Sequence, residues 1–303
     1  MYFKNVIEAV GHTPLVELER ISPTKKVKIF AKLEGLNAGG SASIKDRMAK
    51  YMVEKAEQSG ELTKGKNLVE VTSGNTGIAL AWLGRKKGYK VTLIMSDDMS
   101  LERQQLIRLF GAELILTKAE DGIEAEFDTA RGLLAKDPNY IMLDQFTNPA
   151  NPQAHYETTG VEIIDDFPYD KIDAFIAGSG TGGTIAGIGK RLKGKYPKIK
   201  IFCVEPPFGD TISGIKCMDE LEQYPPFLNL SLITQRAFVT SGQANIATRQ
   251  LLEKEGIFAG QSSGAVVHQA IKVANEMDEG NIVVVLADGG WKYLSMGFWT
   301  KAK

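Results

Sequence analysis

The stretch 37–47 combines small, turn-forming residues with one lysine and reads Asn-Ala-Gly-Gly-Ser-Ala-Ser-Ile-Lys-Asp-Arg. The lysine is Lys45. After it Met48, Met52 and Ala56 recur at helical spacing, which predicts that Lys45 lies near the first turn of a helix. The positive end of the helix dipole disfavours a second positive charge there and helps to keep the amine neutral. Because a neutral amine is a nucleophile, Lys45 is our candidate for the reactive group. The alternative is an ordinary solvated lysine.

Three further polar turns could bind an anion at the start of a helix. They read Thr-Ser-Gly-Asn-Thr-Gly (72–77), Gly-Ser-Gly-Thr-Gly-Gly (178–183) and Gly-Gln-Ser-Ser-Gly-Ala (260–265). Backbone N–H groups at a helix N-terminus bind phosphate or carboxylate groups, and a carboxylate would suit the first turn. Each turn alone could be no more than a helix cap. Together with Lys45, the three turns predict a binding site.

The second turn fits the pattern Gly-x-Gly-x-x-Gly, follows an apolar run that ends at Ala177, and precedes a helix expected to begin at Thr184. Glu205 closes the next apolar run, where a dinucleotide-binding fold places the acid that binds the ribose. Taken alone, this pattern favours an NAD-dependent oxidoreductase. Such a loop can cradle any phosphate, however, so a cofactor with a single phosphate fits it equally well.

The composition bounds the class of protein. The 303 residues are 43% hydrophobic and 24% charged, with a formal net charge of -1, which allows two lobes with separate cores and argues against nucleic acid or a membrane surface as the main partner. Residues 1–5 lack the features of a signal peptide and no apolar run reaches the length of a membrane span, so we expect a cytoplasmic protein. With two cysteines and three histidines, neither a disulfide framework nor a metal site is expected.

The elements that must position these motifs alternate along the chain between apolar, strand-like runs and helical segments. This pattern predicts an α/β protein with largely parallel sheets. A polar loop with two prolines, 144–155, is expected to cross between lobes, and the last helices are expected over 250–255 and from about Val266. The smaller lobe is predicted to span 38–147, and the larger one 1–37 plus 148–303. Strands are predicted at 27–33, 67–71, 91–95, 113–117, 140–143, 174–177, 199–204 and 282–286.

The ordered motifs resemble those of the pyridoxal phosphate enzymes of the tryptophan synthase β fold, known as fold type II. Within that group the chain resembles the cysteine synthase and cystathionine β-synthase family, nearest to the B-type O-acetylserine sulfhydrylases. Lys45 and the three polar turns carry the likeness, and the segments 11–15 (Gly-His-Thr-Pro-Leu) and 144–146 (Asp-Gln-Phe) extend it over nearly the full length. The resemblance implies two lobes, each with a mostly parallel twisted sheet flanked by helices. It also implies that the glycine-rich turn binds the phosphate of pyridoxal 5'-phosphate, not NAD.

The resemblance implies a role for each matching residue. Lys45 would hold the cofactor as a Schiff base and then act as the base that removes the substrate α-proton. Asn75 would hydrogen-bond the ring oxygen of the cofactor, and Ser262 would face the pyridine nitrogen, where a hydroxyl suits β-elimination better than transamination. The cofactor phosphate would be held by Gly178, Gly180, Thr181, Gly182, Gly183 and Thr184. The substrate carboxylate would be bound, with closure of the smaller lobe, by Thr72, Ser73 and Gln145.

The implied reaction is a β-replacement, in which an activated serine such as O-acetylserine loses acetate to give an aminoacrylate and a sulfur nucleophile adds to form cysteine. Lys216 lies in a segment, 209–216, that resembles the mobile loop at the mouth of the site, where a basic residue would help to admit thiosulfate. The alternative for Lys216 is a solvated side chain. The alternative activities are a cysteine-consuming enzyme that releases hydrogen sulfide or forms cystathionine or lanthionine, and, more distantly, the NAD-dependent oxidoreductase. A regulatory binding protein with a degenerate site is disfavoured because the lysine, asparagine and serine at the cofactor positions are all present.

The chain departs from the family pattern at places that shape the site. Ala42 and Ser43 are two residues more than the family has between the glycine pair and the lysine, and Lys292 replaces the usual arginine next to an added Trp291. Ser-Asp at 96–97 stands where many members have Pro-Glu. The sequence therefore leaves the donor open among O-acetylserine, O-phosphoserine, serine and cysteine.

The family resemblance also implies the partners. We expect a homodimer that binds a small amino acid and a sulfur nucleophile. The segment 300–303 lacks the terminal isoleucine by which A-type enzymes dock serine acetyltransferase, so no such complex is expected. No appended heme or regulatory domain is expected either.

Overall fold

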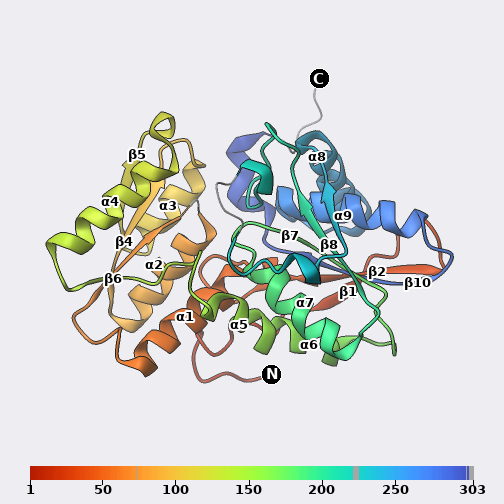
Figure 1. The fold of residues 1–303 in the computed structure, drawn as a ribbon, viewed down its shortest axis with the longest axis horizontal. Helices are drawn as coiled ribbons and strands as arrows, with labels where there is room; N and C mark the ends of the chain where they lie inside the picture. Colours follow the sequence, from red (N-terminus) through yellow and green to blue (C-terminus); the bar gives the residue numbers. More distant parts are fainter. Residues whose placement is uncertain (73, 221–224, 298, 300–303) are drawn as a thin grey trace. The chain divides into compact units, whose positions relative to one another are not determined.

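The computed structural model describes residues 1–72, 74–220, 225–297 and 299 (Figure 1). The chain divides into two compact units, the first comprising Met1–Val10 and Asn37–Ala150, the second Gly11–Leu36 and the described residues from Asn151 onward. Residues 1–10 fall in the first unit, whereas the sequence pattern predicts that 1–37 belong to the larger lobe. The reason is that Ile7 packs against the apolar core of the first unit.

The first unit is built on a parallel sheet whose described strands have the order β5-β4-β3-β6. Its strands are β3 (Asn67–Val71), β4 (Lys90–Ser96), β5 (Glu113–Thr117) and β6 (Tyr140–Met142). Its helices are α1 (Lys45–Ser59), α2 (Asn75–Lys87), α3 (Leu101–Leu109) and α4 (Gly122–Lys136). Because parallel strands end at the same edge, the residues after β3 and after β6 lie close together.

Alternation along β3 explains how helices cover both faces of this sheet. Leu68 joins the core formed with α1, α2 and α3. Val69 and Val71, at alternate positions of the strand, point to the opposite face and pack with Ala130 of α4. A strand buried on both faces has to be apolar nearly throughout. Glu70, 1% exposed in the middle of this strand, is therefore an exception that needs an explanation.

The second unit is built on a mixed sheet whose described strands have the order β1-β2-β10-β7-β8-β9, with β1 antiparallel to β2 and the other pairs parallel. Its strands are β1 (Leu15–Glu17), β2 (Val27–Leu33), β7 (Ala174–Gly178), β8 (Lys200–Glu205), β9 (Gln235–Phe238) and β10 (Gly280–Leu286). The remaining helices are α5 (Ala150–Glu157), α6 (Thr159–Asp166), α7 (Gly183–Lys195), α8 (Ser241–Gln250) and α9 (Gln261–Asn275), with a π-helical segment at Leu251–Glu255. Short 3-10 helices cover Glu34–Leu36, Ala119–Asp121, Met218–Glu220, Leu230–Leu232 and Gly290–Met296.

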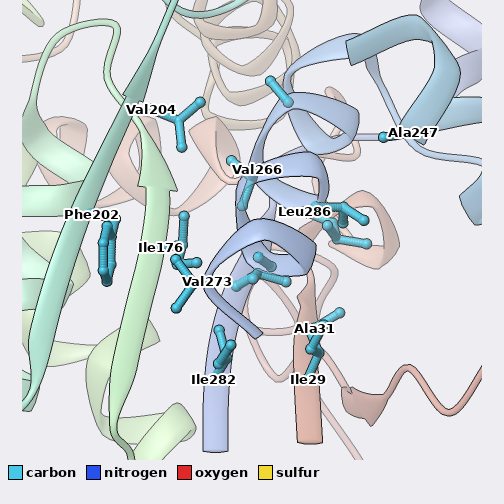
Figure 2. Close-up of a cluster of buried hydrophobic side chains, with 14 of the residues drawn as sticks. Ile29, Ala31, Ile176, Phe202, Val204, Ala247, Val266, Val273, Ile282 and Leu286 are labelled. Atoms are coloured by element: carbon cyan, nitrogen blue, oxygen red, sulfur yellow. The ribbon is translucent and has the colours of Figure 1, made fainter. Parts of the chain in front are cut away.

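The core of the second unit forms where α9 lies on the sheet (Figure 2). Val266 and Val273 of α9 belong to the same buried cluster as Ile29 of β2, Ile176 of β7 and Ile282 of β10. Burying branched side chains of this size contributes roughly 1.5–3 kcal/mol each. The packing fixes the N-terminal end of α9, which carries the third polar turn.

The α/β fold with mostly parallel sheets is confirmed, and the differences from the expected elements are local. Residues 150–155 form most of α5, not a loop. The last long helix begins at Gln261, five residues before the expected start near Val266, and the helical segment of 250–255 is the π-helical continuation of α8. The strand β9 and the body of α8 were not expected, because their sequences are polar and only weakly periodic. Among the helices that the structure describes, none combines the length and apolar character needed to cross a bilayer.

Candidate active site

Lys45 is the first residue of α1, as the spacing of apolar residues predicts. Its backbone N–H donates to Ser43 Oγ at 3.1 Å, and the side chain is partly buried. Ser43 is one of the two residues that the family resemblance counts as additional before the lysine. Its hydroxyl thus supplies an acceptor for an N–H group at the start of the helix, which has no acceptor in the helix itself.

The loop before Lys45 is organised around the carboxylate of Asp46, which is fully buried. Asp46 Oδ1 accepts the Ser41 N–H and Oδ2 accepts the Ser43 N–H, each at 3.0 Å. A Cβ on Gly39 would lie 2.2 Å from Asp46 Cγ, so only glycine fits there. Between the two clamped residues, Ala42 adopts a left-handed φ of 42°. The longer loop is therefore a defined turn that sets the start of α1.

Replacing Asp46 by asparagine is expected to destabilise this turn. The amide would present an NH₂ group to one of the two backbone N–H donors, and the loss of a buried hydrogen bond to a charged group costs about 1.5–3 kcal/mol. Urea denaturation of Asp46→Asn measures this loss. The matched control is Glu124→Gln, which removes an exposed first-turn acid of α4 and should change the free energy of unfolding by less than about 1 kcal/mol. Equal stability of the two variants would contradict this account of the turn.

The first polar turn, 72–77, follows β3 and opens α2. Thr72 Oγ1 accepts the N–H groups of Gly74 and Gly77, each at 3.2 Å. Gly74 has a φ of 151°, and a Cβ there would lie 2.6 Å from Arg103 Cδ. Asn75 is partly buried at the first position of α2. Ser73, which the resemblance assigns to carboxylate binding, lies outside the described residues.

Gln145 is tied to the same turn from the neighbouring strand end. Its Oε1 accepts the Thr76 hydroxyl at 2.6 Å, and its Nε2 donates to the Val71 carbonyl at 3.1 Å. The structure therefore gathers Thr72, Asn75 and Gln145 around the N-terminus of α2. Helix N-terminal N–H groups with hydroxyl and amide donors beside them suit a carboxylate.

Glu70 holds the backbone of this group through hydrogen bonds, and no sequence motif points to it. Its Oε2 accepts the Asp144 N–H at 3.0 Å and its Oε1 the Gln145 N–H at 3.2 Å. Burial raises the pKa of Glu70 to about 8, against the two N–H donors, which lower it. The only sequence signal is a charged residue in an otherwise apolar strand.

In the second unit, the glycine-rich turn follows β7 and leads into α7, which begins at Gly183. A Cβ on Gly180 would lie 2.9 Å from the Gly214 carbonyl oxygen, and one on Gly183 would lie 2.0 Å from Asn151 Oδ1. Gly182 has a φ of 80°. Three of the glycines are thus required by close approach or by a left-handed backbone. The result is a glycine-rich turn with exposed backbone N–H groups at the N-terminus of a thirteen-residue helix, which fits a phosphate group.

Two buried side chains of α5 contact threonine hydroxyls within this turn and in the first turn of α7. Asn151 Nδ2 donates to Thr181 Oγ1 at 3.0 Å. The ring of His155 lies between Thr184 Oγ1 (Nε2, 3.4 Å) and Thr159 Oγ1 (Nδ1, 3.2 Å). The sequence pattern predicts a loop for Asn151 and His155 and indicates no role for them in the site. Their positions on a helix behind the turn now indicate that they orient the two threonine hydroxyls.

The third polar turn and the segment 209–216 lie beside the glycine-rich turn. Ser262, 6% exposed, is in the first turn of α9, and a Cβ on Gly214 would lie 3.7 Å from its Oγ. The Lys216 N–H donates to the Ser179 carbonyl at 2.9 Å. The second unit therefore gathers the glycine-rich turn, Ser262 and the backbone of Lys216.

Lys292, which the resemblance places where the family usually has arginine, is fully buried. Its Nζ lies 3.6 Å from Asp288 Oδ2, and both side chains are at most 1% exposed. The same oxygen accepts the hydroxyl of Tyr293. Asp288 in turn fills the space where a Cβ of Gly260 would stand, 2.0 Å from its Oδ1. The substitution therefore sits within the packing that holds the start of α9, near Ser262.

Glu205, the acid on which the NAD hypothesis depends, is used inside the second unit. It is fully buried, its Oε2 accepts the Met218 N–H at 2.7 Å, and Arg236 Nη2 donates to the same oxygen at 3.1 Å. A ribose-binding acid has to present its carboxylate to the ligand. Glu205 instead joins β8, β9 and the segment after 216. It is therefore not available to bind a ribose, and the NAD hypothesis keeps only the glycine-rich turn in its support.

The site residues thus form two groups, one in each unit. The first unit holds Lys45 and a helix start that suits a carboxylate group, and the second holds a helix start that fits a phosphate group. Residues 6–288 match the family described as "Pyridoxal-phosphate dependent enzyme". The chain belongs to this family. It is therefore a pyridoxal phosphate-dependent enzyme, and the predicted cofactor is confirmed.

Individual members of the family show which enzymes this chain resembles in sequence and in structure. The chain is 40% identical to a cysteine synthase of Staphylococcus aureus (strain Mu50) over 298 residues, which cover 96% of this chain and 95% of the relative. An O-ureido-L-serine synthase structure matches with a TM-score of 0.93 and 35% identity, covering 100% of this chain and 97% of that one. A hydrogen sulfide-producing enzyme of Fusobacterium nucleatum matches with a TM-score of 0.90 and 39% identity, covering 96% of this chain and 100% of that one. The predicted likeness to the cysteine synthases is confirmed.

Proposed function

We propose that the protein catalyses a β-replacement in which an O-acetylserine-like donor and a sulfur nucleophile give cysteine. In the overall reaction, O-acetylserine and hydrosulfide give cysteine and acetate. The observation that carries the proposal is the near full-length similarity to a cysteine synthase, at 40% identity over 96% of the chain. The hydroxyl of Ser262 at the start of α9 supports it, because a neutral group beside the cofactor ring suits loss of a β-substituent.

The cofactor fits the residues that the resemblance assigns to it. The glycine-rich turn would hold the phosphate through its N–H groups and through Thr181 and Thr184, whose hydroxyls Asn151 and His155 orient. Asn75 would bind the ring oxygen, and Ser262 the ring nitrogen. When bound, the cofactor supplies an electron sink for the carbanion that forms on the substrate.

The other steps belong to side chains of this chain. Lys45 Nζ, at the first position of α1, would link to the cofactor in the resting enzyme and then accept the substrate α-proton. Thr72, Ser73 and Gln145 would bind the substrate carboxylate, and Thr72 already accepts two N–H groups of the turn. Lys216 would help to admit an anionic sulfur donor.

A cysteine-consuming activity is the second candidate. It is favoured by one observation, the 39% identity with a hydrogen sulfide-producing enzyme of F. nucleatum over 96% of this chain. The same residues would then remove sulfide from cysteine where the main proposal adds it. We further propose that the enzyme is cytoplasmic, acts as a homodimer, and closes its smaller lobe over the substrate, as the family resemblance implies.

A parallel spectral titration separates these candidates. The purified enzyme, loaded with pyridoxal phosphate, is titrated with O-acetylserine, O-phosphoserine, serine and cysteine, and cysteine and sulfide are assayed in the same samples. We expect the largest change in cofactor absorption with O-acetylserine, and cysteine formation when sulfide is added. Sulfide release from cysteine in excess of cysteine formation would favour the second candidate. A colourless protein that ignores pyridoxal phosphate, or one that responds to none of the four amino acids, would contradict both.

A further inference from the structure

Glu70 is an acid in a strand that is otherwise buried on both faces. Its neighbour Val69 is the last residue of β3 that pairs with β6, opposite Met142. Just beyond this pair, the Glu70 side chain accepts the backbone N–H groups of Asp144 at 3.0 Å and Gln145 at 3.2 Å, one on each oxygen. The carboxyl group of Glu70 thus supplies hydrogen bonds between β3 and the chain after β6, just beyond the last backbone pairing of the two strands.

The backbone that Glu70 holds is a turn that needs support. Asp144 has a left-handed φ of 51°, a conformation that residues with a Cβ rarely adopt. Asp144 Oδ1 accepts the Phe146 N–H at 3.0 Å, and the Asp144 carbonyl accepts the Asn148 N–H at 2.9 Å. The turn is therefore closed on one side by its own hydrogen bonds and held to the sheet by Glu70.

The turn sets the direction of the Gln145 side chain. With its backbone N–H on Glu70, Gln145 reaches the Val71 carbonyl and the Thr76 hydroxyl. These contacts join the end of β3 to the first turn of α2, where Thr72 and Asn75 lie. A shift of the 144–145 backbone would move the amide relative to the N-terminus of α2.

We propose that Glu70 is a positioning residue for substrate binding, which holds the 144–145 turn so that the Gln145 amide faces the carboxylate of the amino-acid substrate. This inference rests on the proposed function of Gln145. Glu70 itself does not touch the substrate. It acts through the two backbone N–H groups that it accepts.

The energetics of Glu70 fit a role in binding better than a role in stability. Burial, and after it the nearby Asp144 carboxylate, raises the pKa of Glu70 from 4.5 to about 8. A group whose folded-state pKa is raised stabilises the fold fully only below its unfolded pKa, and this contribution is lost as the pH rises through its folded pKa. Between about pH 4.5 and 8 the acid therefore weakens the fold progressively. The function of Glu70 is therefore assigned to its two hydrogen bonds with the 144–145 backbone, which fix the position of the turn.

The test is a double-mutant cycle on the pyridoxal phosphate-loaded enzyme. Glu70→Gln keeps the shape but sets an NH₂ group against one of the two N–H donors, so we expect KM for O-acetylserine to rise roughly tenfold or more while cofactor absorption stays as in the wild type. Gln145→Ala should raise KM as well. The double variant should be no worse than Gln145→Ala alone, because Glu70 acts through Gln145. Glu113→Gln, which removes an exposed acid at the start of β5, is the control and should leave KM unchanged.

Hydrogen exchange gives a readout that does not depend on turnover. The amides of residues 144 and 145 should exchange faster in Glu70→Gln than in the wild type. If Glu70→Gln does not fold, Glu70→Asp replaces it, because the shorter side chain keeps the carboxyl group but cannot reach both N–H groups, and it should show the same rise in KM. An unchanged KM, unchanged exchange, or additive effects of Glu70→Gln and Gln145→Ala would overturn the inference. If the wild-type enzyme itself fails to respond to O-acetylserine, the proposed function fails, and not only the role of Glu70.

Discussion

Lys45→Ala is expected to lower kcat by at least about a thousandfold, because one side chain would both link the cofactor and take the substrate α-proton. The purified variant should also lack the visible absorption of the wild type when pyridoxal phosphate is added. The structure places Lys45 at the first position of α1, where its replacement by alanine, a good helix former, should leave the fold intact. The loss should therefore appear in the chemistry and in the spectrum, with the free energy of unfolding nearly unchanged.

Lys50→Ala is the matched control for this loss. Lys50 lies further along the same helix and is also partly buried, so it tests the removal of a positive charge from α1. Absorption spectra, steady-state turnover of O-acetylserine with sulfide, and urea denaturation are measured on both variants. Lys50→Ala should behave as the wild type. A Lys45→Ala enzyme that stays yellow and active would rule out Lys45 as the reactive group.

Gly183→Ala is expected to weaken the binding of pyridoxal phosphate at least about tenfold and to lower stability by about 1–3 kcal/mol. The added Cβ would stand 2.0 Å from Asn151 Oδ1, and Asn151 is fully buried and cannot swing into solvent. Moving Asn151 breaks its hydrogen bond to Thr181 Oγ1. The substitution therefore changes the position of a phosphate-binding hydroxyl as well as the start of α7.

The same helix supplies the control for Gly183. A Cβ on Gly194 of α7 meets no atom within 4 Å, so Gly194→Ala should be stabilising by up to about 1 kcal/mol through helix propensity. Cofactor affinity is measured by absorption or fluorescence titration of the apoenzyme, and stability by urea denaturation. Equal cofactor affinity of Gly183→Ala and Gly194→Ala would show that the close packing at Gly183 does not shape the phosphate site.

The sequence predicts the strands well where short apolar runs are bounded by turn residues. The predicted strands 67–71 and 113–117 coincide with β3 and β5, and Lys45 opens α1 as expected. The helix α5 was mistaken for a loop because its start is rich in asparagine and proline. Asn148 Oδ1 accepts the Ala150 N–H at 2.9 Å, so the asparagine satisfies the first N–H group of a helix whose first turn tolerates Pro152. Turn residues and helix starts use the same amino acids, and only the tertiary fold distinguishes them.

The supporting residues of the site could not be predicted, for a different reason. Glu70 meets Gln145 across 75 positions of sequence, and His155 meets Thr184 across 29. Local periodicity carries no information about such contacts. Motifs reveal the groups that would touch the cofactor because their types are restricted by the chemistry. The residues that orient them are recognised only when the strands and helices bring them together.

The lysine that carries the cofactor can be identified by chemical reduction and peptide mapping. The wild-type enzyme is loaded with pyridoxal phosphate, reduced with borohydride to make the link permanent, digested, and mapped by mass spectrometry. We expect the phosphopyridoxyl group on the peptide that contains Lys45, in stoichiometric amount. Modification of a different lysine, such as Lys216 or Lys292, or of none, would contradict it.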